Sequence, residues 1–357
     1  MIERFSCRHF RNLEPLDWRP DAGPQVVMGA NGGGKTSLLE ALYLLATSRS
    51  FRGARPAECC RRGATAFFLE ADVAGERRAR LAVGWTAEGG LERQLNGKSA
   101  SLADYLALQP VVAWSAADAE LLDGPPLLRR RLLDQGVVAA RPAALGVLAR
   151  YRQALEQKRR LLAEDLSGLG PWNELLAAAA AELVALRRDQ ADRLGETLAR
   201  VLAGSDLDLG TVELVYRPSV DPGEEGAAAI LARLEEVRGG ERRQRRPLLG
   251  PHRDDLEVLW QGHGLRRTAS AGEKKLLGLA LTAARGRLLG ALGRQPLYLL
   301  DDADGDLDRR RLATAWGLFE QAPQLIATSH RPEAWKAVSG IVRRRLEGGR
   351  LEPAGGS

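Results

Sequence analysis

Apolar and polar positions alternate between strand-like and helix-like spacing in the first 114 residues. Apolar runs predict two short strands, one at 2–10 and one beginning at Val26, with proline and glycine breakers between them. The segment after the second strand carries an apolar stripe at helical spacing: Leu38, Leu39, Leu42, Leu45 and Ala46. We therefore expect a helix at this point that packs on a sheet.

Further strands are predicted before the pattern changes. Residues 67–73 and 79–85 alternate apolar and polar side chains, and a second strand pair turns at Asn96-Gly97. This spacing predicts an antiparallel sheet beside the first helix. Residues 110–114 form a short apolar run that is typical of a buried strand.

The middle of the chain, from 115 to 249, is rich in Ala, Leu and Arg and has mostly helical spacing. Two apolar stripes lie on either side of a break at 168–171. The first contains Leu145, Leu148, Tyr151, Leu155, Leu162 and Leu166, and the second contains Leu176, Leu183, Leu186, Leu194, Leu198 and Val201. Two such helices joined by a tight break predict an antiparallel hairpin, which we call the arm. A strand at 211–216, a helix at 227–238 and a basic loop at 242–246 are expected after it.

From Gly250 the pattern returns to mixed α/β. The apolar run 297–300 predicts a buried strand that ends in two carboxylates, Asp301 and Asp302, and a second buried strand is predicted at 324–327. We therefore predict an α/β fold in which a helical arm is inserted into one discontinuous head. The head comprises 1–114 and 250–357, and the arm comprises 115–249.

Composition narrows the class of protein. The chain has 357 residues, enough for a large core, and 52 Lys and Arg against 46 Asp and Glu give a net charge of +6. A basic balance favours a polyanionic partner but is weak on its own. Three cysteines, Cys7, Cys59 and Cys60, make no disulfide framework, and no apolar run reaches the roughly 18 residues of a membrane span. We expect a cytoplasmic protein that does not act in a membrane.

The most specific motif follows the strand at Val26. Gly29-Ala30-Asn31-Gly32-Gly33-Gly34-Lys35-Thr36 matches the G-x-x-x-x-G-K-T loop, and it stands between a predicted strand and a predicted helix, as a phosphate-binding loop requires. Its backbone N–H groups and the helix N-terminus would bind phosphates. Lys35 would reach the β- and γ-phosphates of ATP, and Thr36 would ligate Mg²⁺; Ser37 completes the predicted nucleotide site. The alternative is a glycine-rich turn before an ordinary helix.

The carboxylates after the strand at 297–300 supply the second half of such a site. In a P-loop protein the first carboxylate at this position, here Asp301, holds Mg²⁺ beside the phosphates. His330 follows the strand at 324–327 and could sense the γ-phosphate, although a histidine at a strand end is nearly as often an ordinary one.

A third motif, Ser270-Ala271-Gly272-Glu273, lies upstream of the acidic strand. Taken alone it is a helix N-terminus with a capping serine. In a chain with a phosphate-binding loop it is similar to the ABC-type signature, in which Ser270 and Gly272 of one subunit would cap the γ-phosphate bound to another, with Glu273 beside them.

Basic clusters in or beside the arm favour binding to a polyanion such as DNA. The candidates are Arg129, Arg130, Arg131, Lys158, Arg159, Arg160, Arg187 and Arg188. Such groups neutralise phosphates and give salt-dependent, sequence-independent affinity. No recognition helix or aromatic stacking ladder is evident, so base readout is not expected. The alternative for each cluster is a solvated helix face.

With these motifs in place, the whole chain resembles the RecF family of bacterial recombinational DNA repair. The resemblance is carried by Phe10-Arg11-Asn12-Leu13, the phosphate-binding loop, 39–46, 48–52, 95–98, 110–112, 129–134, 151–155, Gly250-Pro251-His252-Arg253-Asp254-Asp255-Leu256 and Asp301-Asp302. The segment 250–256, at this distance from the loop, is the most specific of them.

The resemblance implies an ABC-type P-loop ATPase head that binds ATP and Mg²⁺, dimerises on ATP and binds gapped DNA or single- to double-strand junctions. Family members act with RecO and RecR to load a recombinase in DNA repair and replication restart. The resemblance implies that Asp302, with Lys35, is catalytic and positions the attacking water in a slow, DNA-stimulated ATPase. The chain departs from the family at Ala271, Glu273 and Gly305, which affects the expected contacts across the dimer.

Four alternatives remain at this point. An ABC transporter subunit is disfavoured by the long helical insert and the basic arm, and an SMC- or Rad50-like head would need a far longer coiled coil. The chain could also be a divergent paralogue of the RecF and SMC-like ATPases, or a nucleotide-binding scaffold with little turnover.

Overall fold

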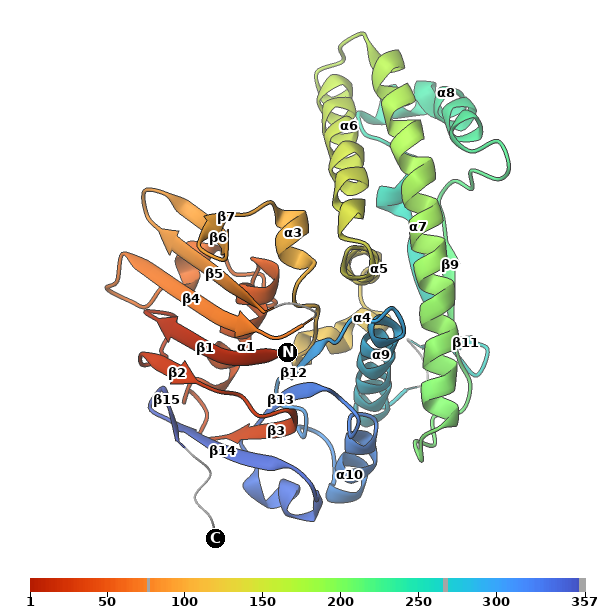
Figure 1. Ribbon diagram of the computed structural model, residues 1–357. Coiled ribbons are helices and arrows are strands. Elements are labelled where there is room, and N and C mark those ends of the chain that lie inside the picture. The colour runs from red at the N-terminus through yellow and green to blue at the C-terminus, as the bar shows by residue number, and fades with distance from the viewer. Residues whose placement is uncertain (76–77, 266–268, 353–357) are drawn as a thin grey trace. The chain divides into compact units, whose positions relative to one another are not determined.

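The computed structural model describes residues 1–75, 78–265 and 269–352, which fold into two compact units (Figure 1). The second unit contains Glu120–Ala199 and Gly210–Thr268, and the first contains the remaining described residues. The arm boundary that we predicted at 250 differs from this division. The reason is a strand pairing, because β10 (Asp255–Trp260) lies antiparallel to β9 (Val212–Arg217) along its whole length.

The first unit contains an antiparallel sheet with the strand order β2-β1-β4-β5-β6-β7. Its strands are β1 (Ile2–Arg8), β2 (Leu16–Trp18), β4 (Ala66–Val73), β5 (Ala79–Thr86), β6 (Gly90–Leu95) and β7 (Lys98–Ser99). The alternation predicted at 67–73 and 79–85 is confirmed, since Phe67, Leu69 and Leu81 are buried while Phe68 and Arg80 are exposed.

A second sheet of the first unit has the order β15-β14-β3-β13-β12-β8. Its strands are β3 (Gly23–Met28), β8 (Val111–Trp114), β12 (Leu297–Leu300), β13 (Gln324–Ser329), β14 (Val342–Glu347) and β15 (Arg350–Glu352). All neighbouring pairs are parallel except β14 with β15. The carboxyl ends of β3, β12 and β13 therefore lie at one edge of the sheet, where parallel α/β folds bind their ligands.

Helix α1 (Lys35–Thr47) belongs to the core shared by the two sheets. Its residues Leu38, Leu39, Leu42 and Leu45 are at most 1% exposed. They share one hydrophobic cluster with Phe5 of β1 and Leu299 of β12. Burial on all sides explains the nearly continuous apolar run of this helix.

Helix α9 (Ala271–Ala291) covers the second sheet at β8. At Gly278 the helix approaches the sheet so closely that a Cβ atom would lie 2.1 Å from the ring of Trp114. A larger residue here would push the helix away from the sheet, and with it the signature residues at the N-terminus of α9. Helix α10 (Arg309–Gly317) follows the acidic strand.

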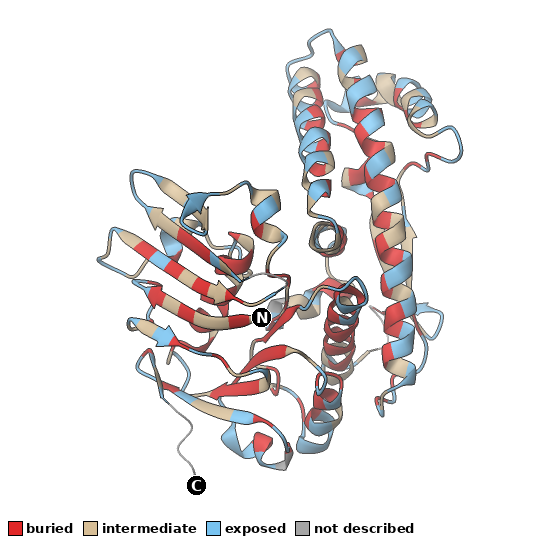
Figure 2. Ribbon diagram, viewed as in Figure 1, coloured by how far each residue is buried: buried red, intermediate tan, exposed pale blue. Residues whose placement is uncertain are grey.

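The second unit is mainly helical, as predicted for the arm. It contains α4 (Glu120–Asp123), α5 (Pro126–Ala140), α6 (Leu145–Ala163), most of α7 (Leu169–Ala203), α8 (Ala227–Gln244) and the small sheet β11-β10-β9, in which β11 is His263–Gly264. The core joins α6, α7 and α8 through Leu148, Leu155, Leu183 and Leu234. Buried and exposed turns alternate along α6 and α7 in Figure 2, as two amphipathic helices require.

Two details of the arm differ from the sequence prediction. Leu166 does not continue the apolar stripe of α6, because the helix ends at Ala163 and the leucine lies in the connecting turn, 45% exposed. The predicted basic loop at 242–246 begins inside α8, which runs on to Gln244. Short helical segments complete the chain at Pro56–Cys59 (α2), Leu102–Leu106 (α3), Ala116–Ala119, Pro142–Ala144, Pro251–Arg253 and Pro332–Ala337.

Candidate nucleotide site and basic surface

The phosphate-binding loop connects β3 to α1, as its motif predicts. Gly34 precedes the helix at φ 103°, a conformation in the range that favours glycine, and it lets Lys35 begin the helix directly. Asn12 braces the loop, since its Nδ2 donates to the Gly32 carbonyl at 2.8 Å and its Oδ1 accepts from Ser37 at 2.8 Å. In the sequence, Asn12 is distinguished only as part of the family resemblance.

Lys35 folds back on its own loop. Its Nζ donates to the carbonyl oxygens of Gly29, at 2.8 Å, and Ala30, at 2.9 Å, and the residue is 8% exposed. Burial lowers the pKa of Lys35, and the nearby Asp302 and Asp301 oppose that shift. The ammonium group is thus held over the loop by weak backbone acceptors, which phosphate oxygens would replace with stronger, charge-assisted hydrogen bonds.

Thr36 and Asp301 meet across the site. The Thr36 hydroxyl donates to Asp301 Oδ1 at 3.0 Å, and Thr328 of β13 donates to the same oxygen at 2.7 Å. Burial raises the pKa of Asp301. A carboxylate in this setting is disfavoured unless a cation approaches it, so the residues present fit Mg²⁺, which prefers oxygen ligands.

Protein side chains alone supply too few ligands for a closed metal site. Among the described residues no group of three or more His, Cys, Asp or Glu side chains could hold a metal ion. A cation between Thr36 and Asp301 would therefore depend on phosphate and water oxygens for the rest of its coordination, as Mg²⁺ commonly does.

Asp302 follows Asp301 directly and has a different set of contacts. Its Oδ1 is 2.8 Å from Nδ1 of His330, and its carbonyl accepts from Lys275 Nζ at 2.9 Å. The backbone of Asp302 has φ 50°, an uncommon left-handed conformation, and its N–H donates to the Thr328 hydroxyl at 2.9 Å. The structure therefore brings Asp302 and His330 together, and it adds Lys275 and Thr328, two supporting residues that the sequence work missed.

Asp304 is a further supporting residue that was not predicted from the sequence. It is fully buried, and its Oδ2 accepts from Ser329 at 2.8 Å while its backbone carbonyl accepts from Arg331 at 2.9 Å. These contacts fasten the turn after β12 to the end of β13. Only the run of acidic residues from 301 to 308 could have signalled this role.

Ser270 caps α9 as its pattern predicts. Its Oγ accepts from the Glu273 N–H at 3.3 Å, and the Glu273 carboxylate accepts from the Ser270 N–H at 2.8 Å and from its hydroxyl at 2.7 Å. The two residues form a capping box, and these hydrogen bonds lower the pKa of Glu273. Gly272 lies in the first turn of the same helix.

The predicted DNA-binding residues divide into two groups. Arg129, Lys158 and Arg187 are buried, with exposures of 8%, 0% and 4%, so these three candidates are not surface charges. Each has an acidic partner: Arg129 pairs with Asp255 at 2.7 Å, Lys158 with Glu241 at 2.7 Å and Arg187 with Asp134 at 2.9 Å. A buried charge needs such a partner, and the pairing takes it away from phosphate.

The other candidates remain accessible. Arg131, Arg159 and Arg160 are exposed, the Arg188 side chain is 41% exposed, and Arg130 is half-buried. Arg242, Arg243, Arg245 and Arg246 at the end of α8 are exposed as well. The described part of the second unit therefore keeps a basic surface, formed by five of the eight predicted candidates and by the arginines of the predicted basic loop at 242–246.

Comparison with known proteins shows the family to which the chain belongs. Residues 1–349 match the family described as RecF/RecN/SMC N terminal domain. The chain is 33% identical to the DNA replication and repair protein RecF of Acidothermus cellulolyticus over 345 residues, 92% of this chain and 93% of the relative. It is also 33% identical to RecF of an Anaeromyxobacter species over 366 residues, 98% of each.

Solved structures share the fold. A structure titled for the recombination mediator protein RecF-ATP in the RecFOR pathway superimposes with a TM-score of 0.88 at 24% identity, covering 99% of this chain and 97% of that one. An Smc head bound to a winged-helix domain of ScpA gives a TM-score of 0.59 at 16% identity, covering 98% and 96%. The fold is therefore the ABC-type head shared by RecF and SMC proteins, and by its sequence the chain belongs to the RecF family.

Proposed function

We propose that this protein is an ATP-switched DNA-binding protein of recombinational DNA repair and replication restart. The observation that carries the proposal is the meeting of Thr36 and Asp301 at 3.0 Å beside a phosphate-binding lysine, in a chain of the RecF family. That geometry suits a nucleoside triphosphate with a divalent cation. The relatives are named as DNA replication and repair proteins, which supports the proposed pathway.

In this proposal ATP binds with its phosphates over 29–37. Lys35 exchanges its two backbone acceptors for phosphate oxygens, and Thr36 and Asp301 hold Mg²⁺, which would neutralise phosphate charge. Asp302 accepts a proton from the attacking water, and His330, 2.8 Å away, orients that carboxylate and senses the γ-phosphate. Hydrolysis is slow and serves to reset the switch.

ATP would also join two copies of the chain. Ser270, Gly272 and Glu273 at the N-terminus of α9 would face the γ-phosphate bound to the other copy. The positive end of the dipole of a 21-residue helix suits an anion. A dimer formed in this way exists only while the triphosphate is intact.

DNA is the partner that the basic surface of the second unit favours. Its exposed arginines would neutralise phosphates without reading bases, so we expect binding to gapped DNA and to single- to double-strand junctions of any sequence. RecO- and RecR-like proteins are the proposed protein partners, with recombinase loading as the outcome. Among the described residues no helix is long and apolar enough to cross a membrane, and Cys7, Cys59 and Cys60 are free thiols. A cytoplasmic location is part of the proposal because free thiols are typical of reducing compartments.

One experiment tests the switch directly. DNA binding and self-association should be measured with no nucleotide, with ADP and with ATP, each across a series of salt concentrations. We expect ATP to promote both, and the DNA affinity to fall steeply with salt. Equal DNA affinity and equal association in all three nucleotide states would contradict the switch.

A further inference from the structure

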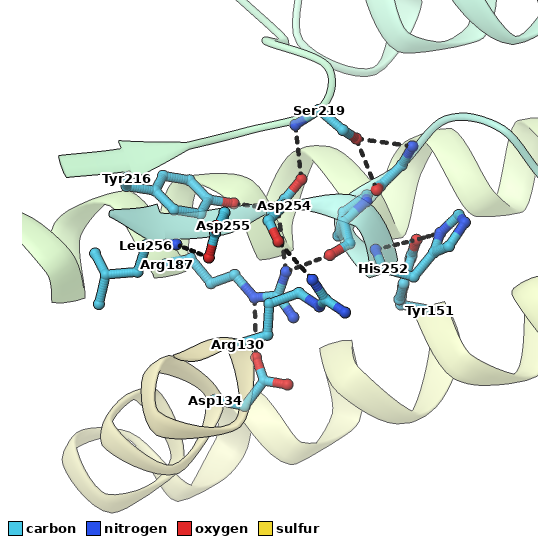
Figure 3. Close-up of polar contacts among 12 residues, drawn as sticks. Arg130, Asp134, Tyr151, Arg187, Tyr216, Ser219, His252, Asp254, Asp255 and Leu256 are labelled. Carbon is cyan, nitrogen blue, oxygen red and sulfur yellow. Dashed lines mark hydrogen bonds and ion pairs between the residues drawn. The ribbon is translucent and has the colours of Figure 1, made fainter. Parts of the chain in front are cut away.

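The turn from Gly250 to Leu256 is held by a network of buried polar contacts in the second unit (Figure 3). Asp254 is fully buried, and its Oδ1 accepts from the Ser219 N–H at 2.8 Å. Its Oδ2 accepts from Arg187 at 3.0 Å and from the Tyr216 hydroxyl. Ser219 also donates to the Gly250 carbonyl at 2.7 Å. Both carboxylate oxygens of Asp254 are satisfied, which fixes the backbone of the turn.

The acidic groups of this network are all matched by arginines. Arg187 donates to Asp134 at 2.9 Å as well as to Asp254, and Arg129 binds Asp255 through two nitrogens at 2.7 and 2.9 Å. Arg152, with Nη2 4.0 Å from Asp134, is a third arginine beside these three aspartates, so the charges of the network balance. Any further arginine at the turn therefore adds positive charge that the network does not neutralise.

Two arginines at the turn are such additions. Arg130 is half-buried, and its Nη1 donates to the backbone carbonyl of Asp254 at 2.6 Å. Arg253 is exposed and occupies the position before Asp254. Among the described residues, neither arginine has a carboxylate within 4.0 Å. The carbonyl that anchors Arg130 belongs to Asp254, the residue that follows Arg253, so both arginines are fixed to the same short backbone segment.

A third arginine lies near by. Tyr151 of α6 is hydrogen-bonded to His252, with its hydroxyl 2.7 Å from Nδ1, and Arg159 lies two turns farther along that helix. The Arg159 side chain points back toward the N-terminus of α6, where its Nη1 lies 3.7 Å from the carboxylate of Glu156. Burial, together with the charges of Arg159, Arg253 and Arg130, lowers the pKa of His252 to about 4, so the histidine is neutral at pH 7.

We infer that Arg130 and Arg253 together hold one backbone phosphate of bound DNA at the 250–256 turn, with Arg159 contributing charge beside them. A guanidinium binds phosphate oxygens through paired N–H donors, and anchoring it beforehand reduces the entropy lost on binding. The site rests on the proposed DNA-binding function and names the contact that performs it.

The test measures the affinity of the full-length protein for a fluorescent gapped DNA, with ATP present, across a salt series. We expect Arg253→Gln to weaken binding about tenfold at low salt, by the same factor on two unrelated sequences. Arg130→Gln with Arg253→Gln should reduce the slope of log affinity against log salt by about one, because both side chains serve one phosphate. Arg253→Lys should keep the slope.

Arg193→Gln is the matched control. Arg193 belongs to the same unit, its side chain is 44% exposed, and it is paired with Asp189 at 2.8 Å. Thermal unfolding of each variant shows whether the network has survived. A wild-type protein that binds no DNA in any nucleotide state would contradict the proposed function and this site with it. If the wild type binds DNA and the double variant matches Arg193→Gln, only the phosphate site is wrong. A fall in slope of about two would mean that the two arginines serve separate phosphates and would overturn the shared site.

Discussion

The hydroxyl of Thr36 donates a hydrogen bond of 3.0 Å to the carboxylate of Asp301, 265 positions later in the chain. The contact exists because β12 and β3 flank β13 in one parallel sheet, so that their carboxyl ends lie at one edge. Thr36 begins α1 just beyond β3, and Asp301 follows β12 directly. Two motifs that are each common alone thus become one site, in which oxygen ligands for a cation face a lysine suited to phosphate.

Replacing Lys35 by alanine should weaken nucleotide binding, and with it ATP-driven dimerisation, without unfolding the protein. In the structure its Nζ bonds only to the carbonyls of Gly29 and Ala30 among the described residues, so little stability depends on it. Loss of its charge-assisted bonds to phosphate should weaken ATP binding by about 10- to 100-fold. Isothermal titration calorimetry measures this directly. Lys98→Ala, an exposed lysine on β7, is the control, and a Lys35 variant that still dimerises with ATP would contradict the role.

Asp302→Asn should abolish hydrolysis while keeping ATP bound. An amide takes no proton from water, and loss of a general base costs about 100- to 10,000-fold in rate. Asparagine tolerates the left-handed backbone at φ 50°, so the turn should keep its shape. Single-turnover hydrolysis and ATP affinity are the two measurements.

The control for Asp302 is Asp306→Asn. Asp306 is exposed in the same turn and has a similar φ of 57°. Asp306→Asn therefore removes the same charge as Asp302→Asn, from a residue with a similar backbone conformation. If both variants lose hydrolysis to a similar extent, or if Asp302→Asn hydrolyses ATP at the wild-type rate, Asp302 is not the general base.

Local motifs explain why much of the nucleotide site could be predicted from the sequence. The loop before Lys35, the capping box at Ser270 and the strand before Asp301 each depend on a few neighbouring residues, and the structure has the expected strand, loop or helix at each. Lys275 and Thr328 could not be predicted in the same way. Their contacts with Asp302 join segments that only the fold brings together.

In the arm, helical spacing alone does not predict which charged side chains are exposed. Lys158 and Arg159 are neighbours in one basic cluster, yet Lys158 is fully buried against Glu241 of α8 while Arg159 is exposed. Which side of α6 is covered depends on how α8 packs, and spacing along α6 alone does not contain that information. Arg253, by contrast, lies within the most specific motif of the sequence. The sequence does not show that positive charge is in excess beside it, because this depends on which arginines pair with the nearby aspartates in the fold.

The stability of the second unit should fall in mild acid because of His252. Its pKa is about 4 in the folded protein against 6.5 for an ordinary histidine, so between these pH values the unfolded chain binds more protons. Stability is therefore complete above about pH 6.5 and decreases as the pH falls toward 4, by no more than about 3 kcal/mol from this residue.

Urea unfolding of the wild type and of His252→Gln at pH 7, 6 and 5 isolates the histidine, because other groups titrate equally in both proteins. The wild type should lose more stability between pH 7 and 5 than the variant does. His263→Gln is the control, since His263 is exposed on β11. Parallel pH profiles for wild type and His252→Gln would rule out the titration of a buried histidine.

Glu273→Gln should strengthen the ATP-dependent dimer. In the structure the Glu273 carboxylate accepts the Ser270 hydroxyl at 2.7 Å, so this proton points to Glu273 and not toward an approaching phosphate. The carboxylate also repels the γ-phosphate that the proposed dimer would bring to this helix terminus. Glutamine keeps a capping oxygen without the charge.

We expect the dimer dissociation constant in ATP to fall about three- to tenfold, which corresponds to roughly 1 kcal/mol for removing one exposed like-charge contact. Sedimentation velocity in the Asp302→Asn background prevents turnover during the measurement. Glu333→Gln, an exposed carboxylate paired with Lys336 in the same unit, controls for the change in net charge. If Glu273→Gln weakens the dimer instead, the carboxylate stabilises the contact, and the serine at this helix terminus works together with it.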